Sequence, residues 1–291
     1  MTGLASLVPS VAADPSASAD LSPFLRRLGC GTGRRLRASA VTPWLLPAGL
    51  LALWAATSGT GALPAHVLPA PWAIAAAHDK IVDGSLLADV AVSFRRAVSG
   101  LLLGGGIAFA LGLANGLSKI SERLTDTTVQ MVRNIPNLSL IPLVILWFGI
   151  GEEAKLFLTA LGVFFPVYIN TFHGVRTVDA QLLEMGRSYG MGRFDLFRRS
   201  VLPGALPSIF VGLRYALGIM WLTLIVAETI AASSGIGHMA MEAREFLRVD
   251  VVVLAILIYA GLGKLADVAV RLLERLTLSW HPAFADPRGS K

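Results

Sequence analysis

Long apolar runs separated by short polar segments dominate the hydropathy pattern of this 291-residue chain. The runs are continuously apolar rather than alternating, which favours helices, and an apolar helix of about 20 residues crosses the hydrocarbon core of a bilayer. The pattern therefore predicts an all-α integral membrane protein with about six transmembrane helices. The predicted spans are Val41–Gly61, Ala97–Leu117, Leu138–Ile150, Leu156–His173, Ser208–Ala231 and Val251–Val270. The third is short for a crossing, so it either begins nearer Asn134 or tilts little.

The segments outside these spans complete the predicted domain organisation. Residues 1–40, rich in Ala, Ser, Pro and Arg, are predicted to form a disordered basic cytoplasmic tail, because the first strong apolar run starts too late for an ordinary secretion signal. After the first transmembrane helix (41–61), residues 62–96 are predicted to be a periplasmic amphipathic segment. The core transmembrane domain (97–270) and a cytoplasmic C-terminal tail (271–291) follow.

The distribution of basic residues predicts the orientation. Most of the Lys and Arg residues outside the predicted spans fall in the segments that share a side with both termini. The positive-inside rule then places both termini in the cytoplasm, in a multi-pass protein of the cytoplasmic (inner) membrane.

Composition excludes several classes of function. Hydrophobic residues make up 54% of the chain and charged residues only 15%, which lies outside the usual range for soluble proteins. The net charge of +6 comes from dispersed basic residues rather than one basic patch with aromatics, so no nucleic acid partner is expected. Cys30 is the single cysteine, and the histidines lack ligand-like spacing, so we expect no metal, no cofactor and no catalytic residue.

A polar loop between the fourth and fifth spans, residues 174–207, has the pattern of two short helices. Asp179 can cap a helix that runs to Tyr189, and Gly190 can end it in the left-handed conformation. A second helix leads through Phe197 to Pro203. From periodicity alone, this is either a firm projection for a partner or an interfacial hairpin whose arginines contact anionic membrane lipid.

The spacing within the loop resembles the EAA loop by which permeases of bacterial ABC importers dock onto their ATP-binding subunits. Glu184, Gly190 and the pair Leu202 and Pro203 fall in register with that pattern. Met185 and Gly186 stand where the family has two alanines. The resemblance implies a cytoplasmic coupling loop with the coupling residues Glu184, Met185, Gly186, Gly190, Leu202 and Pro203.

Other stretches extend the resemblance to roughly residues 40–282. Segments 141–151, 165–171, 202–209 and 212–218 look like the aliphatic sulfonate importer permease and its taurine and nitrate relatives. The resemblance implies a type I (MetI-like) permease fold and a homodimer, with two copies of an ATP-binding subunit and a periplasmic sulfonate-binding protein. The permease itself would not be an enzyme. Alternatives are a permease for taurine, nitrate or a related small anion, or a secondary transporter without an ATPase.

Polar groups inside the apolar spans are candidates for a translocation path or gate, because charges there are costly. Arg214 could attract an anion in transit or reach lipid headgroups, and Glu228 suits a gate or a helix-packing partner. Asn170, Trp221 and Thr223 could line a path, although packing also explains each of them. Glycines four residues apart, such as Gly100 with Gly104, predict close helix approach rather than a phosphate loop.

Overall fold

The computed structural model describes residues 44–62, 64, 66–75 and 84–278, and the chain divides into two units, residues 1–53 and 54–291. All regular elements in the described ranges are helical, as the hydropathy pattern predicts. The predicted tail 1–40, and the C-terminal tail beyond residue 278, lie outside these ranges. In the first span, α2 (Leu45–Gly59) has 15 residues, so its described part is shorter than a full crossing.

Four helical segments of the second unit are long and apolar enough to cross a membrane. They are α5 (Ser85–Leu117), α8 (Glu152–Arg176), the continuous segment Arg193–Ile230 that contains α11 (Leu202–Ala231), and α13 (Val249–Thr277). Shorter elements connect them: α3 (Pro71–Ala75), α6 (Lys119–Arg133), the 3-10 turn η2 (Asn137–Leu140), α7 (Ile141–Phe148), α9 (Ala180–Ser188), α10 (Arg193–Leu196), the π-turn η3 (Phe197–Val201) and α12 (Ile236–Glu245).

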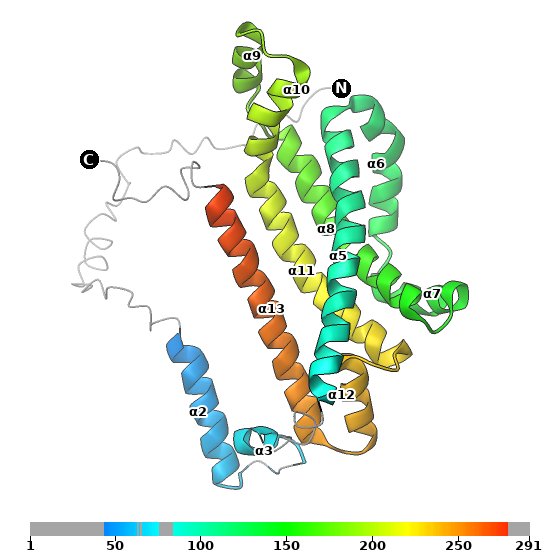
Figure 1. Ribbon diagram of the computed structural model, residues 1–291, viewed down its shortest axis with the longest axis vertical. Helices are drawn as coiled ribbons and strands as arrows, with labels where there is room; N and C mark the ends of the chain where they lie inside the picture. The colour runs from blue at the N-terminus through cyan, green and yellow to red at the C-terminus, as the bar shows by residue number, and fades with distance from the viewer. Residues whose placement is uncertain (1–43, 63, 65, 76–83, 279–291) are drawn as a thin grey trace, which may run out of the picture. The chain divides into compact units, whose positions relative to one another are not determined.

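The helices α5, α8 and α11 form the packed centre of this unit (Figure 1), with α8 in contact with both of the others. Glycines on α5 allow the close contact with α8. A Cβ at Gly104 would lie 2.1 Å from the carbonyl oxygen of Ala160, and one at Gly100 would lie 2.5 Å from Cγ2 of Thr159. The glycine spacing thus predicts the helix contact correctly.

The second span starts earlier than predicted. The helix α5 begins at Ser85 rather than Ala97, so the last part of the predicted periplasmic segment 62–96 is the first part of a candidate membrane-spanning helix. Charged residues such as Asp89 and Arg96 made this stretch look like a loop. In the structure Asp89 accepts a hydrogen bond from the Gly235 N–H at 2.8 Å and Arg96 donates to Glu228 at 2.7 Å, which lets both lie in a packed helix.

The third predicted span also differs. The stretch 138–150 forms only η2 and the eight-residue helix α7, which Gly149 ends at φ 72°. The preceding residues, predicted as a loop, form α6, and α6 with η2 and α7 makes a fifth candidate span that is bent by 85°. The side chains of α6 look too polar for a span, but Asp126 accepts a hydrogen bond from the Tyr168 hydroxyl at 2.8 Å.

The last helix continues past the predicted inner boundary at residue 270. It ends at Thr277, so the first residues of the predicted C-terminal tail belong to α13. Asp267 and Glu274 on this helix form ion pairs with Arg214 of α11. The extra turns therefore serve as a packing surface rather than as a free tail.

Candidate functional site

A projection of two short helices, α9 and α10, connects α8 with α11. Figure 1 shows it at the opposite end of the second unit from α12. The Asp179 side chain accepts a hydrogen bond from the Gln181 N–H at 2.8 Å and so caps α9 as predicted. Gly190 has φ 77°, and the Met191 N–H bonds to the Gly186 carbonyl at 3.1 Å, which closes the end of α9. The predicted turn is confirmed.

The interior of the projection is small and centres on Gly186. This glycine is buried, and a Cβ there would lie 2.6 Å from Cδ1 of Leu196. The absence of a side chain lets α10 pack directly across α9. Below this contact, Val175, Val201 and Ala205 form a separate apolar cluster that joins the projection to α8 and α11.

The spacing of Leu182, Met185 and Tyr189 places them on one face of α9 and its C-cap, and this apolar stripe points outward. Met185 is 52% exposed, Tyr189 is 79% exposed, and Phe194 on α10 is 73% exposed. Glu184 is exposed beside Met185. The stripe therefore lies largely on the surface of the chain, and the projection presents exposed aromatic and aliphatic side chains as well as an exposed carboxylate.

The projection leads into the fifth span without a break. The helical segment Arg193–Ile230 contains 38 residues and includes α10, η3 and α11. Leu202 is the first residue of α11, and Pro203 follows it within the first turn. Since proline has no N–H to donate to the carbonyl four residues earlier, the wider η3 turn coincides with a place where regular bonding is interrupted.

Glu228, a predicted gate or packing residue, lies in a buried polar network at the other end of α11. Its carboxylate accepts hydrogen bonds from Ser93 Oγ at 2.8 Å, Arg96 Nη1 at 2.7 Å and the Tyr259 hydroxyl at 2.9 Å. The Gly237 N–H donates a fourth bond at 3.0 Å. The network joins α5, α11, α12 and α13.

Arg96 extends this network to α8. Its guanidinium donates to both oxygens of Glu152, at 2.7 and 2.5 Å, and to the Ser234 carbonyl at 2.6 Å. Lys155 also contacts Glu152, at 2.8 Å. Sequence reasoning missed Ser93, Arg96 and Tyr259. Arg96 could have been found only by extending the second span through its charged outer end.

Arg214 is held by acidic residues of α13. It forms an ion pair with Glu274 and lies 3.9 Å from Asp267. Asp267 also pairs with Lys264, three residues earlier on α13, at 3.8 Å. Because its charge is balanced by two carboxylates, Arg214 is a weaker candidate for attracting an anion than its position in the sequence indicates.

The three remaining candidates lie at different places. Asn170 Nδ2 donates to the Pro166 carbonyl at 2.9 Å, and the Thr223 hydroxyl donates to the Ile219 carbonyl at 2.9 Å. Trp221 is buried and packs edge-on against Tyr259, and its Nε1 has no hydrogen-bond partner in the part of the chain that the structure describes. Of the three, Thr223 lines a cavity, together with Gly162 and with Arg133 at the end of α6.

Comparison with known proteins identifies the family. Residues 106–278 match the family described as binding-protein-dependent transport system inner membrane component. A protein of Escherichia coli (strain K12) described as an aliphatic sulfonates transport permease, SsuC, is 57% identical over 84% of this chain and 93% of its own length. The Bacillus subtilis (strain 168) protein of the same description is 44% identical over 82% and 87%.

A taurine transport system permease protein of Escherichia coli, TauC, is 36% identical over 69% of this chain and 73% of its own length. These similarities exclude the alternative of a secondary transporter that works without an ATPase. The chain belongs to the inner membrane components of binding-protein-dependent transport systems, the non-enzymatic permease subunits of ABC importers, which work with a separate ATP-binding subunit and a substrate-binding protein.

Proposed function

We propose that this chain is the permease subunit of an importer that carries aliphatic sulfonates across the inner membrane into the cell. The proposal rests on the order of sequence identity to relatives whose names give different substrates. Identity is 57% to the sulfonate permease of Escherichia coli, 36% to its taurine counterpart and 31% to a nitrate import permease of Leptolyngbya laminosa. The share of this chain that is covered falls in the same order, from 84% to 69% to 62%.

The projection is the proposed docking site for the ATP-binding subunit. Its exposed apolar side chains support this role, because Met185, Tyr189 and Phe194 are large and exposed, and Glu184 adds an exposed carboxylate to the same projection. The two-helix bend depends on Gly186 and Gly190, so these residues act by shaping the surface. Leu202 and Pro203 act at the junction with α11.

Motion of the docked subunit would reach the membrane through α11. The projection and Glu228 lie on one continuous helical segment, with η3 and Pro203 as the place where its regular bonding is interrupted. Glu228 in turn contacts α5, α12 and α13 through hydrogen bonds. A shift of α11 along its axis would therefore disturb contacts to three other helices at once.

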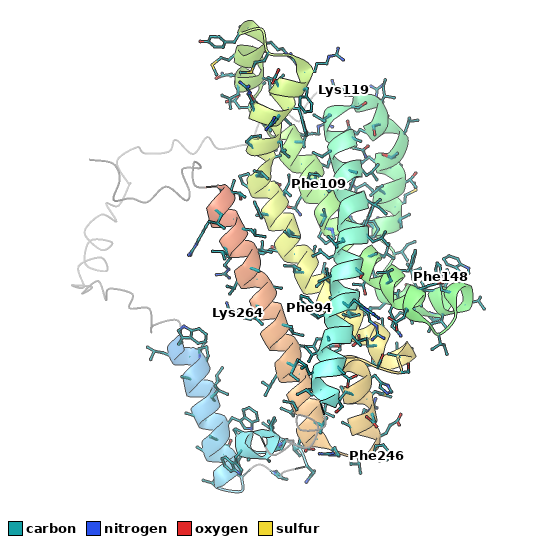
Figure 2. The ribbon with its side chains drawn as sticks, viewed as in Figure 1. Phe94, Phe109, Lys119, Phe148, Phe246 and Lys264 are labelled. Atoms are coloured by element: carbon teal, nitrogen blue, oxygen red, sulfur yellow. The ribbon has the colours of Figure 1, made fainter. Side chains whose placement is uncertain are left out.

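The functional unit is proposed to contain two copies of this chain and two ATP-binding subunits, with both termini in the cytoplasm. Basic residues of the projection and the adjoining turn support the orientation, since Arg187 and Arg193 lie on α9 and α10, and Arg198 and Arg199 lie on η3. Lys119, at the turn between α5 and α6, lies toward the same end of the unit (Figure 2). Both observations agree with the positive-inside rule.

The substrate is tested by uptake into proteoliposomes that contain the permease, its ATP-binding subunit and ATP, with the cognate binding protein outside. We expect uptake of radiolabelled alkanesulfonates and much less uptake of taurine or nitrate. Uptake of nitrate in preference to every sulfonate would reject the assignment, and uptake without the ATP-binding subunit would reject ATP-driven import.

A further inference from the structure

We propose that Arg133 and the cavity beside it bind the substrate during its passage, with the guanidinium on the sulfonate group and the alkyl chain against the apolar wall. This inference rests on the proposed function and names the place in the permease where the sulfonate is held. No motif in the sequence points to Arg133, because the residue falls in a stretch that looks like a cytoplasmic loop.

The cavity has a volume of about 470 Å³ and lies where the end of α6 and η2 meet α8 and α11. That volume is within the range of small-molecule sites. Arg133 is its only charged lining residue, and Asn137 supplies an amide. Most of the remaining wall is apolar, with contributions from Leu138, Phe165, Ile169 and Leu222.

Arg133 differs from Arg96 and Arg214 in having no acidic partner. Within the described residues it makes no ion pair and no side-chain hydrogen bond, whereas Arg96 contacts Glu152 and Glu228, and Arg214 contacts Glu274. The other charged group deep in α6, Asp126, is bonded to Tyr168. Arg133 is thus an exposed guanidinium with its hydrogen-bonding capacity unused.

The position of Arg133 along α6 makes its lack of an acidic partner unusual. It is the last of the 15 residues of α6, whose first residue, Lys119, lies near the cytoplasmic turn (Figure 2). At 1.5 Å per residue, α6 carries the chain about 22 Å away from that turn, against a hydrocarbon thickness of about 30 Å. An unpaired charge inside the hydrocarbon layer is costly in lipid and marks a water-filled or ligand-binding surface.

The chemistry of the cavity fits an alkanesulfonate better than a small inorganic anion. A guanidinium donates parallel hydrogen bonds to two oxygens of an oxyanion, as it does with carboxylates and phosphates. An alkyl chain would bury apolar surface against Leu138 and Phe165, which nitrate or sulfate could not do. A single cation with no surrounding charge network also permits release, which transport requires.

The cavity is placed where helix movement can change it. A Cβ at Gly162 of α8 would lie 2.8 Å from the Thr223 hydroxyl oxygen of α11, so these helices touch at the cavity wall. The wall formed by α11 belongs to the same continuous segment as the projection. A shift of α11 driven from the projection would therefore alter the space around a bound sulfonate.

The test uses reconstituted permease with its ATP-binding subunit and loaded binding protein, and compares Arg133→Gln and Arg133→Lys with Arg123→Gln. Arg123 lies on the same helix, is exposed and does not line the cavity. We expect Arg133→Gln to lower ATP-driven hexanesulfonate uptake by roughly tenfold or more, the scale of one lost charge-assisted hydrogen bond. Arg133→Lys should retain an intermediate rate and Arg123→Gln the wild-type rate, with co-purification of the ATP-binding subunit unchanged in all three variants.

A second variant tests the apolar wall independently. Leu138→Trp narrows the cavity from an exposed position on η2, and we expect it to reduce hexanesulfonate uptake more than methanesulfonate uptake. If Arg133→Gln fails to co-purify with the ATP-binding subunit, the ratio of hexanesulfonate uptake to methanesulfonate uptake in Leu138→Trp tests the inference instead. Wild-type uptake in Arg133→Gln, or an unchanged ratio in Leu138→Trp, would overturn the inference and leave the proposed function intact. Absence of sulfonate uptake by the wild type would overturn both.

Discussion

Arg96 Nη1 lies 2.7 Å from Glu228 Oε1, although the two residues are 132 positions apart in the chain. Both side chains are almost fully buried, with 3% and 0% of their surface exposed. The pair joins α5 to α11, and the other bonds of each residue reach α8, α12 and α13. This one contact therefore fixes the relative positions of most of the long helices at that end of the unit.

We expect Glu228→Ala to destabilise the permease strongly. It leaves Arg96, Ser93 and Tyr259 buried without their shared acceptor, and breaking a buried ion pair from one side typically costs about 3–5 kcal/mol. Thermal unfolding of the purified permease in detergent measures the effect. Glu245→Ala, which removes an exposed carboxylate from the end of α12, is the control and should leave the unfolding temperature unchanged. Equal unfolding temperatures for the two variants would show that the network does not stabilise the fold.

Glu184→Lys should abolish binding of the ATP-binding subunit without affecting insertion or stability. Glu184 is exposed, so its reversal removes no internal contact, but it places a cation in the proposed docking surface. Co-purification through a tag on the permease is the measurement. The matched control, Glu245→Lys, reverses a charge on α12 at the opposite end and should retain its partner (Figure 1). Capture of the ATP-binding subunit in wild-type amounts by Glu184→Lys would refute the docking role.

Gly190→Ala should loosen the projection and lower transport. Its φ of 77° is unfavourable for a residue with a Cβ, at a cost of roughly 1–2 kcal/mol. Hydrogen exchange of the amides in α9 and α10 should accelerate by up to about tenfold for each 1.4 kcal/mol. Gly192→Ala is the matched control, because Gly192 has φ −65° and lies two residues away in the same turn. Comparable exchange in both variants would mean that the backbone conformation at Gly190 does not hold the bend.

Gly104→Ala should force α5 and α8 apart, since the added Cβ would meet the Ala160 backbone at 2.1 Å. Backbone cannot move aside as a side-chain end can, so a loss of about 1–3 kcal/mol, typical of overpacking, is expected. On the same helix, a Cβ at Gly106 would meet nothing within 4 Å. Gly106→Ala should therefore be neutral or slightly stabilising. The two unfolding temperatures, measured side by side, test the contact, and similar values would contradict it.

The elements that could be predicted from the sequence depend on local signals. Asp179 caps α9 two residues away, and Gly190 ends it, so the bend of the projection follows from neighbouring residues. The orientation of the α9 stripe could not be predicted in this way. Periodicity shows that Met185 and Tyr189 share a face, but only the packing of Gly186 against Leu196 shows that this face points outward.

The parts that could not be predicted are those in which distant residues compensate polar groups. The first part of α5 packs as a helix in the membrane domain because Arg96 contacts Glu152 and Glu228, which lie far away in the sequence. Polar residues of α6 likewise depend on other helices, Asp126 on Tyr168 of α8 and Thr125 on Asn115 of α5. A hydropathy pattern treats each of these charged residues as unpaired. It therefore predicts loops for both stretches and does not identify Arg133 as a residue of the membrane domain.

The continuity of Arg193–Ile230 has a thermodynamic consequence for the importer. If a nucleotide bound beneath the projection changes the affinity of the outer face for the loaded binding protein, then the binding protein must change nucleotide affinity by the same factor. One helical segment reaching from the projection to the Glu228 network would carry influence in both directions. Docking of the loaded binding protein would then change the affinity of the ATP-binding subunit for ATP. ATP hydrolysis would in this way depend on the presence of a substrate to import.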